Sequence, residues 1–500
     1  NLKLLNLISL SDNNLFKIGN SKFENNSEFS FKLNKKLKIK DLSINSELAI
    51  YDLDYIGKIN DLSNYLVDYK ESINFKKINL NVNYNNKNLK ISGQGKYKLN
   101  SNEDFIKFYI KKNKDYYDFD INIKLDKSKL IIDQINYIKK NNQKANLHIL
   151  GKYNLNKNII LKKIFFSENK NNISVDDIKL NSKFKIINFK KVKFNYLTSN
   201  NIFNEFVIAL NNSNYTIKGK SYDAIKLIKN ITDTEKKSNF FDIFEQINSK
   251  INVNLKKVYL DKKNIVNNFN GTLELRKNKI IDLNLYSNFS ESENFFITIK
   301  SSNSNQKVTT LYSDKAVPFV RNFKFIEGFE NGVLDYNSTQ NEKISKSQIK
   351  IYNFKVKKVP ILAKLLTLAS FQGIADLLTG EGIRFDEFEM NYSTKDNLIT
   401  IDEIYSIGPS ISILMDGYIQ LNELISLRGT LVPATTVNKI IGKIKGIGNI
   451  LVGKKKGEGV FGVSFKIKGP PKNLKTTVNP IKTLTPRFIT RTLEKIKKEN

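Results

Sequence analysis

Apolar and polar side chains alternate one by one in many short segments of the first 315 residues. Clear examples are 78–84, 89–99, 117–125, 145–155, 269–275 and 281–285. A period of two is typical of β-strands that have one buried and one solvated face. Turns rich in Asn and Lys separate several segments, so the pattern predicts antiparallel hairpins in a long meander. One face of this sheet is expected to be apolar, and the other to carry Lys, Asn and Asp.

Few segments of this region have helical spacing. The exception is a helical insertion near 221–250, where one or two helices are predicted by the spacing of Ile225, Ile228, Phe240, Phe241, Phe244 and Ile247. A sheet with one apolar face must bury that face against something. The sequence allows two sheets packed face to face in a sandwich, or one sheet curled into an open trough that holds a non-protein ligand.

Proline marks a boundary in the chain. All eight prolines lie at or after Pro318, and Pro is excluded from central strands because it cannot donate to the ladder. We therefore expect a repetitive antiparallel groove region over 1–315 and a different region over 316–486. In the second region the apolar spacing predicts short helices within 360–379, with Gly380 as a helix C-cap. Strands are expected at 349–356, 398–401, 411–415, 418–421 and 424–427.

Composition excludes several classes of site. The chain has no Cys and one His, so disulfide frameworks, thiolate metal sites, thiol nucleophiles and catalytic triads have almost no residues to draw on. Its 82 Lys and Arg exceed its 49 Asp and Glu, giving a formal net charge of +33, yet only six of the basic residues are Arg. Base and phosphate recognition favours the planar fork of Arg. The charge therefore predicts a lysine-coated solvated surface and no nucleic-acid partner.

Three motifs that could carry chemistry have simpler interpretations. The run GNILVGKK at 448–455 lacks the Ser or Thr of a P-loop, so a hairpin loop is expected. His148 shares its parity with Asn146 and Lys152 and is expected on the polar face, so no metal site and no cofactor are predicted. A solvated face rather than a catalytic carboxylate pair is predicted for Asp386, Glu387, Glu389, Asp402 and Glu403.

Six short motifs follow one another in the second region. They are PILA at 360–363, LTGEGI at 378–383, IGPS at 407–410, RGTLVP at 428–433, GEGVFG at 457–462 and VNP at 478–480. In order and spacing the series resembles the C-terminal region of the AsmA-like family, in particular its YhdP-type branch of Gram-negative envelope proteins. That family is similar to the bridge-like lipid-transfer proteins. The resemblance covers about residues 315–490, and for 1–300 it is one of architecture alone.

The resemblance implies a mainly β fold in which a long, curled antiparallel sheet forms an open hydrophobic groove with a few short helices. It implies a periplasmic protein without enzymatic activity, anchored to the inner membrane by an N-terminal segment outside this chain. Such a protein would transfer phospholipid between the inner and outer membranes and so serve outer-membrane biogenesis. The partners it implies are phospholipids, both membrane surfaces and an envelope protein.

The residue pattern agrees independently with a groove. Burial contributes about 0.8 kcal/mol per methylene, so a 16-carbon acyl chain needs a shield worth about 12 kcal/mol. A continuous apolar stripe along one sheet face would supply it. The residues predicted to line this groove are Leu80, Val82, Ile91, Phe119, Ile121, Ile123, Leu147, Ile149, Leu273 and Leu283.

The last residues, 487–500, have a basic amphipathic pattern. One helical face would carry Ile489, Leu493 and Ile496, and the other would carry Arg487, Arg491 and Lys495. This tail is predicted to contact an anionic membrane, and a frayed solvated terminus is the alternative.

Two alternatives to lipid transfer stay open at the level of sequence. The protein could be a periplasmic scaffold or regulator of outer-membrane assembly that acts by protein contacts, with its groove filled by side chains. It could also bind polyanions through its lysine-rich face, which would make binding steeply salt-dependent. Phospholipid that co-purifies with the protein would favour lipid transfer over both.

Overall fold

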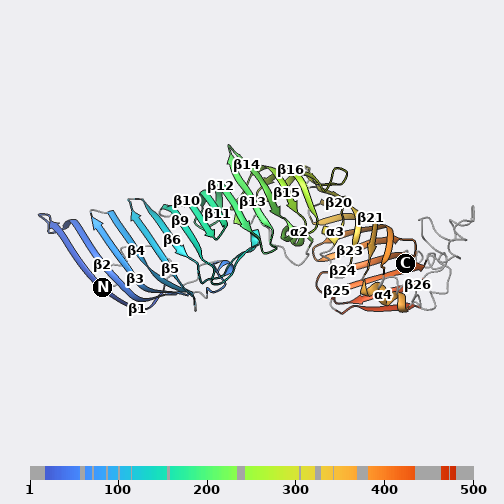
Figure 1. The fold of residues 1–500 in the computed structure, drawn as a ribbon, viewed down its shortest axis with the longest axis horizontal. Coiled ribbons are helices and arrows are strands. Elements are labelled where there is room, and N and C mark those ends of the chain that lie inside the picture. Colours follow the sequence, from blue (N-terminus) through green and yellow to red (C-terminus); the bar gives the residue numbers. More distant parts are fainter. Residues whose placement is uncertain are drawn as a thin grey trace, which may run out of the picture. The chain divides into compact units, whose positions relative to one another are not determined.

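The computed structural model is mainly β. It describes residues 17–56, 62–69, 72–85, 88–99, 102–113, 115–154, 158–232, 243–302, 306–320, 328–341, 343–357, 359–368, 381–433, 463–471 and 473–479. Hydrogen bonds join 25 strands into a single curled antiparallel sheet, and two further strands form a separate pair (Figure 1). The helices within these residues are four short α-helices and one short 3-10 helix.

The chain divides into two compact units. Unit 1 comprises Asn1–Asp223, Asn239–Ile251 and Arg276–Lys279, and unit 2 comprises Ala224–Ser238, Asn252–Leu275 and Ile280–Asn500. The elements of unit 1 are β1 (Lys17–Leu33), β2 (Ile39–Ile56), α1 (Leu62–Tyr65), β3 (Ser72–Asn85), β4 (Asn88–Leu99), β5 (Asn102–Lys112), β6 (Tyr116–Lys124), β7 (Leu130–Ile132), η2 (Asp133–Ile135), β8 (Tyr137–Lys139), β9 (Ala145–Asn154), β10 (Ile159–Glu168), β11 (Asn171–Leu180), β12 (Ile186–Leu197), β13 (Phe203–Asn211) and β14 (Asn214–Asp223).

Unit 2 contains α2 (Ile225–Thr232), α3 (Val317–Val320) and α4 (Pro360–Leu368), together with most of β15 (Ser249–Tyr259), β16 (Ile265–Arg276) and β17 (Lys279–Asn288). Its remaining strands are β18 (Asn294–Ser301), β19 (Gln306–Ser313), β20 (Glu330–Asn341), β21 (Ile344–Val356), β22 (Ile383–Lys395), β23 (Leu398–Ile407), β24 (Ile411–Gln420), β25 (Leu424–Pro433), β26 (Val463–Gly469) and β27 (Lys475–Asn479).

Within each unit, most strands of the sheet pair with the next strand along the chain. In unit 1 the pairing runs from β1 to β14, and β6 pairs with β9 because the β7–β8 pair lies outside the sheet. In unit 2 it runs from β17 to β27. All these pairs are antiparallel, so the meander predicted from the alternation is confirmed.

Asparagine builds many of the tight turns. Left-handed backbone with φ between 51° and 64° occurs at Asn142, Asn169, Asn201, Asn212, Asn278 and Asn422. Asn tolerates this conformation better than most residues because its short polar side chain bonds the local backbone. The high Asn content therefore serves the hairpins.

Successive strands of unit 1 run in opposite directions, so the turns between them lie alternately at the two ends of the strands. The turns 34–38 and 181–185 lie at one end, which we call the hairpin end. The other end carries a small layer formed by α1, β7, η2 and β8, which we call the cap (Figure 1). Its Leu130 and Tyr137 pack against Phe166, Ile173 and Tyr196 of the sheet in one buried cluster.

Unit 2 buries one side of its sheet more completely. Helices α3 and α4 pack on the apolar face, where Leu362, Leu365 and Leu366 are buried with strand residues that include Ile351 and Leu431. These contacts form a continuous hydrophobic core.

The sandwich alternative is wrong, because one curled sheet contains 25 of the strands. The insertion 221–250 contains helix α2, and the region 360–379 contains α4, while 233–242 and 369–380 lie outside the described residues. The separate strands expected at 411–415 and 418–421 form a single strand, β24, which continues through Gly417.

Candidate functional site

The central feature of unit 1 is a row of apolar side chains that crosses eleven consecutive strands in register. This middle row consists of Leu48, Leu80, Gly93, Phe108, Ile121, Ile149, Ile164, Val175, Val192, Ile208 and Ile217. Directly opposed residues on one face of a sheet have their Cβ atoms close together, so these side chains touch across strands. At about 4.8 Å per strand the row is about 48 Å long.

Two further rows flank the middle row on the same face. The cap row, nearer the cap, consists of Gly95, Ile106, Ile123, Leu147, Phe166, Ile173, Phe194, Phe206 and Gly219. The hairpin row, nearer the hairpin end, consists of Val82, Ile91, Ile110, Phe119, Gly151, Leu161, Ile178 and Phe189. Rows lie two residues apart along most strands, and the middle and hairpin rows are three apart in β10, β11 and β12, so the three rows together are about 14 Å wide.

The burial of the middle row is intermediate. Nine of its ten apolar side chains are half-buried, and only Val192 is buried. Lateral contacts with neighbours in the sheet cover part of each side chain, whereas a facing layer of protein would bury them almost completely. The middle row is therefore an apolar surface that the described residues leave partly open to solvent.

At two glycine positions, apolar side chains of the neighbouring strands fill the space that a side chain would otherwise occupy. A Cβ atom built on Gly93 would lie 2.3 Å from Leu80 Cδ2 and 2.7 Å from Phe108 Cζ. A Cβ atom on Gly151 would lie 2.6 Å from Phe119 Cζ. The neighbouring apolar side chains thus lean over these positions, and the rows stay continuous where a side chain is missing.

The cap covers the end of this face and is held by buried polar groups. Lys139 is fully buried, and its Nζ donates to the backbone oxygens of Ser128 at 2.8 Å and Lys140 at 3.0 Å. Burial lowers the pKa of this ammonium group. The buried Asp104 accepts hydrogen bonds from the backbone N–H groups of Lys127 and Ser128 and from the Ser128 hydroxyl.

A second buried contact ties the cap to the sheet. The Tyr137 hydroxyl donates to Glu168 Oε2, which also accepts from Asn171 Nδ2 at 2.8 Å. Burial, followed by the hydrogen bond to the carboxylate, raises the pKa of Tyr137. Because these groups are satisfied only when β8 lies against β10, they fix the position of the cap.

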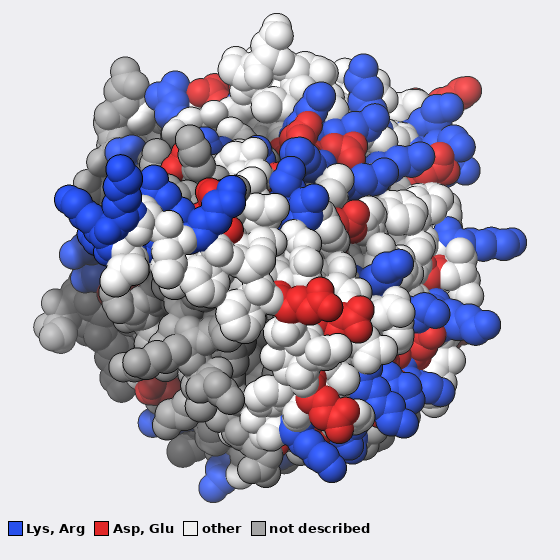
Figure 2. Space-filling view, turned by 90° about the vertical axis from the view of Figure 1, so that its left-hand side faces the viewer, with Lys and Arg blue, Asp and Glu red and all other residues white. Residues whose placement is uncertain are grey.

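The opposite face of unit 1 is polar and hydrogen-bonded across strands. His148 lies there, as its parity predicts, with Nε2 2.8 Å from Asp120 Oδ1. The neighbouring rung joins Asn146 Nδ2 to Asn122 Oδ1 at 3.0 Å. On the face of the molecule drawn in Figure 2, basic and acidic side chains are interleaved over much of the surface.

Eight of the ten predicted groove residues lie in the three rows of unit 1. Leu80, Ile121 and Ile149 belong to the middle row. The other five divide between the hairpin row, with Val82, Ile91 and Phe119, and the cap row, with Ile123 and Leu147. In unit 2, Leu273 is half-buried in β16, and Leu283 is buried in β17 opposite Ile299. Whether any of these residues contacts a lipid stays a prediction.

Unit 2 also has a row of mainly apolar side chains in register across its strands, and part of this row is covered by helices α3 and α4. It consists of Leu285, Ile297, Leu311, Tyr336, Ile349, Met390, Ile404, Met415, Gly429, Phe465 and Val478. Several of these residues belong to or pack against the core beneath α3 and α4, namely Leu311, Ile349, Met415, Phe465 and Val478. The adjacent row is apolar in β17 and β18, with Leu283 and Ile299, and becomes polar in β19, β20 and β21, with Thr309, Ser338 and Ser347.

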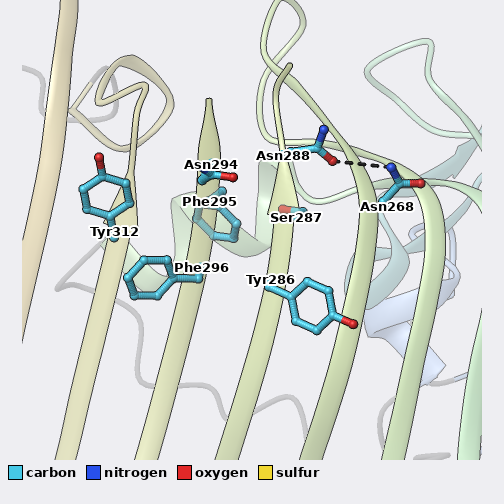
Figure 3. Close-up of a pocket in the computed structure, with 8 residues that line it drawn as sticks. All are labelled: Asn268, Tyr286, Ser287, Asn288, Asn294, Phe295, Phe296 and Tyr312. Carbon is cyan, nitrogen blue, oxygen red and sulfur yellow. Dashed lines mark hydrogen bonds between the residues drawn. The ribbon is translucent and has the colours of Figure 1, made fainter. Parts of the chain in front are cut away.

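A shallow pocket of about 380 Å³ lies on the polar face of unit 2. Four aromatic residues line it, and three of them, Tyr286, Phe296 and Tyr312, come from adjacent strands and lie beside one another (Figure 3). The fourth is Phe295. The rings of Phe296 and Tyr312 stack with centroids 5.3 Å apart. A hydrogen bond of 2.6 Å to Asp314 raises the pKa of Tyr312 to about 12. The unit 2 row residues Leu285, Ile297 and Leu311 are not among the lining residues, whereas Ser287 and Phe295, which have the same parity along their strands, are.

Of the acidic residues predicted to form a solvated face, Asp386 and Asp402 are exposed. Glu389 pairs with Lys350 at 3.5 Å and accepts from Gln348 and Asn391, which makes it part of a polar rung. Within the described residues no three His, Cys, Asp or Glu side chains gather as a metal site would require. The 448–455 run lies outside the described residues, as do the predicted membrane-contact residues Arg487, Ile489, Arg491, Leu493, Lys495 and Ile496.

Sequence reasoning missed the residues that depend on the tertiary arrangement. The cap residues Tyr137 and Lys139 have no periodic signal, and a lysine in a short polar segment is usually exposed. For Gly93 and Gly151 the sequence gives a weak signal, because an isolated Gly within an alternating strand often marks a place where a neighbouring group packs closely against the backbone.

Comparison with known proteins leaves the family unassigned. No protein-family model matches the chain, and no curated protein is significantly similar to it. Of the helices among the described residues, none has the length and apolarity needed to cross a bilayer. The resemblance to the AsmA-like family thus rests on the motifs alone.

Proposed function

We propose that the protein binds lipid acyl chains on the apolar face of unit 1 and carries phospholipid along it without catalysing a reaction. The observation that carries this proposal is the middle row, in which nine of ten apolar side chains are half-buried over eleven strands. An apolar surface of this extent is costly to leave in water, and surfaces larger than a few hundred Å² usually mark a binding site.

The dimensions of the face suit an acyl chain. One leaflet contributes about 15 Å to the hydrocarbon core of a bilayer, whereas the middle row is about 48 Å long. A chain of 16 carbons therefore finds continuous apolar contact wherever it lies along the row. Because the row contains only aliphatic and aromatic side chains, with one glycine, successive positions offer similar affinity and no deep trap.

The motifs of the second region suggest where this activity belongs. In our proposal the protein works in the periplasm of a Gram-negative envelope, with an inner-membrane anchor outside this chain. It moves phospholipid between the inner and outer membranes in support of outer-membrane biogenesis. Its partners are then the two membrane surfaces and an envelope protein.

Photo-crosslinking from defined positions tests the proposal directly. A photoreactive amino acid at Ile121 or Ile149 should crosslink to phospholipid in cells, detected as a mass shift and identified by lipid mass spectrometry. The matched control is Asn122, which neighbours Ile121 in β6 but lies on the polar face. The proposal is wrong if lipid adducts are absent at the row positions or equally frequent at Asn122.

The same experiment separates the alternatives. A scaffold whose groove is filled by protein gives crosslinks from Ile121 to polypeptide and none to lipid. A polyanion-binding protein gives neither, and it binds a sulfated polysaccharide with steep salt dependence.

A further inference from the structure

Two hairpin turns of unit 1 share one unusual geometry. The turn 34–38 places Leu37 at its tip, and the turn 181–185 places Phe184 at the equivalent position. In each turn a leading Asn accepts backbone hydrogen bonds through its side-chain oxygen, at 2.9–3.0 Å, from the residues two and four positions later. Both tip residues have left-handed backbone, with φ of 52° for Leu37 and 59° for Phe184.

Large apolar residues are unfavourable in this conformation. Branched or bulky side chains rarely adopt positive φ, and the equivalent position of many other turns of this chain is Asn. In the part of the chain that the structure describes, Leu37 and Phe184 are the two apolar non-glycine residues with positive φ. They are also exposed, at 79% for Leu37 and 71% for Phe184. Neither side chain contributes to the core, so folding does not explain its presence.

The surroundings of Leu37 are both apolar and basic. Leu33 and Ile39, at the ends of the flanking strands, are 54% and 59% exposed, and Phe29 is 69% exposed. The segment 34–40, NKKLKIK, has four lysines and no acidic residue. The other tip, Phe184, stands between Lys183 and Lys185. Single apolar side chains framed by lysines are typical of elements that lie in the interface of an anionic bilayer.

The two tips also lie on the same side of the sheet. Both turns follow odd-numbered steps of the antiparallel meander, β1 to β2 and β11 to β12, and both therefore fall at the hairpin end. The cap occupies the opposite end. Near the second turn Phe244 and Glu245 lie against Ile186, yet the side chain of Phe184 still projects into solvent. Convex tips of this kind offer no concave surface for a folded partner, whereas a bilayer needs none.

We propose that the hairpin end of unit 1 binds anionic membranes, with Leu37 and Phe184 inserted among the acyl chains and the flanking lysines at the headgroups. This contact is independent of the proposed lipid carriage, because its residues lie outside the three rows. The strained backbone at the two tips is retained because it presents an apolar side chain to the membrane.

A single tryptophan can report the insertion, because the chain contains none. Leu37→Trp is mixed with vesicles of phosphatidylcholine containing about one third phosphatidylglycerol, and with vesicles of phosphatidylcholine alone. We expect a blue shift of Trp emission with the anionic vesicles and a much smaller one with the neutral vesicles. The matched control is Phe105→Trp, at an exposed position within β5, which should show no shift with either.

A second variant separates binding from folding. Leu37→Asn with Phe184→Asn puts a residue that favours left-handed backbone at both tips, so its melting temperature should rise. Its affinity for the anionic vesicles in a sedimentation assay should nevertheless fall at least tenfold. The proposal is overturned if this variant binds like the wild type, if the emission of the Leu37→Trp variant stays unshifted, or if neutral vesicles bind equally well. Groove crosslinks at Ile121 are scored separately, so failure of one proposal leaves the other testable.

Discussion

A single charge in the middle row should stop lipid movement while leaving the protein folded. Ile121 lies in β6 between Phe108 and Ile149 of the adjacent strands, and it is half-buried. In Ile121→Asp the carboxylate can remain hydrated in the free protein because the described residues form no layer over it. We therefore expect a loss of only about 1–2 kcal/mol in the free energy of unfolding.

The effect on a bound acyl chain is much larger. An acyl chain that covers position 121 must strip water from the carboxylate, which costs several kcal/mol for an ion in an apolar setting. Taking about 4 kcal/mol, occupancy of this part of the row falls about a thousandfold. Because position 121 lies in the middle of three rows that together are about 14 Å wide, its carboxylate stands within about 7 Å of either flanking row and hinders passage along the whole face.

The assay is transfer of a fluorescent phospholipid from donor to acceptor vesicles, with melting curves measured in parallel. The matched control, Asn122→Asp, adds the same charge at the next residue, on the polar face. We expect transfer to fall to the protein-free rate in Ile121→Asp and to stay unchanged in Asn122→Asp. Equal transfer rates for Ile121→Asp and the wild type would refute the reasoning, and so would equal loss in the control.

Three further changes test the supporting structure. Gly93→Ala forces neighbouring side chains apart and should lower the free energy of unfolding by about 1–3 kcal/mol in a denaturant titration. Tyr137→Phe removes a donor to buried Glu168, and we expect a similar loss together with faster hydrogen exchange in β8. In the folded protein the pKa of Tyr312 is raised to about 12, chiefly by its hydrogen bond to Asp314. This contact therefore stabilises the fold below about pH 10 and is lost between about pH 10 and 12, so Tyr312→Phe should flatten the stability profile in that window.

The alternation of side chains placed the eight predicted groove residues of unit 1 on one face of the sheet. Leu80, Ile121 and Ile149 all fall in the middle row because a period of two assigns the face without knowledge of the partner strand. The alignment between strands was not predictable in the same way. It depends on irregularities such as the register shift between Leu161 and Lys163, which nothing in the local pattern announces.

The cap was beyond sequence reasoning for a physical reason. Lys139 looks like a surface residue, yet it is fully buried because three backbone carbonyls converge on its ammonium group. Those carbonyls belong to a segment whose course is set by contacts with the sheet, so no local signal marks them. The same holds for Leu37, whose strained and exposed position is visible only once its backbone angle is known.

The sequential pairing of strands has an evolutionary and kinetic consequence. Where a strand pairs with the strands before and after it in the sequence, as from β9 to β14 and from β17 to β27, inserting or deleting one complete hairpin preserves the orientation of the strands that follow and leaves their apolar side chains on the same face. Genes for such chains can therefore vary the span of the molecule in steps of about 10 Å. Contacts between strands that are close in sequence also keep the entropic cost of loop closure low, so newly synthesised strands can add to the sheet one after another during translation.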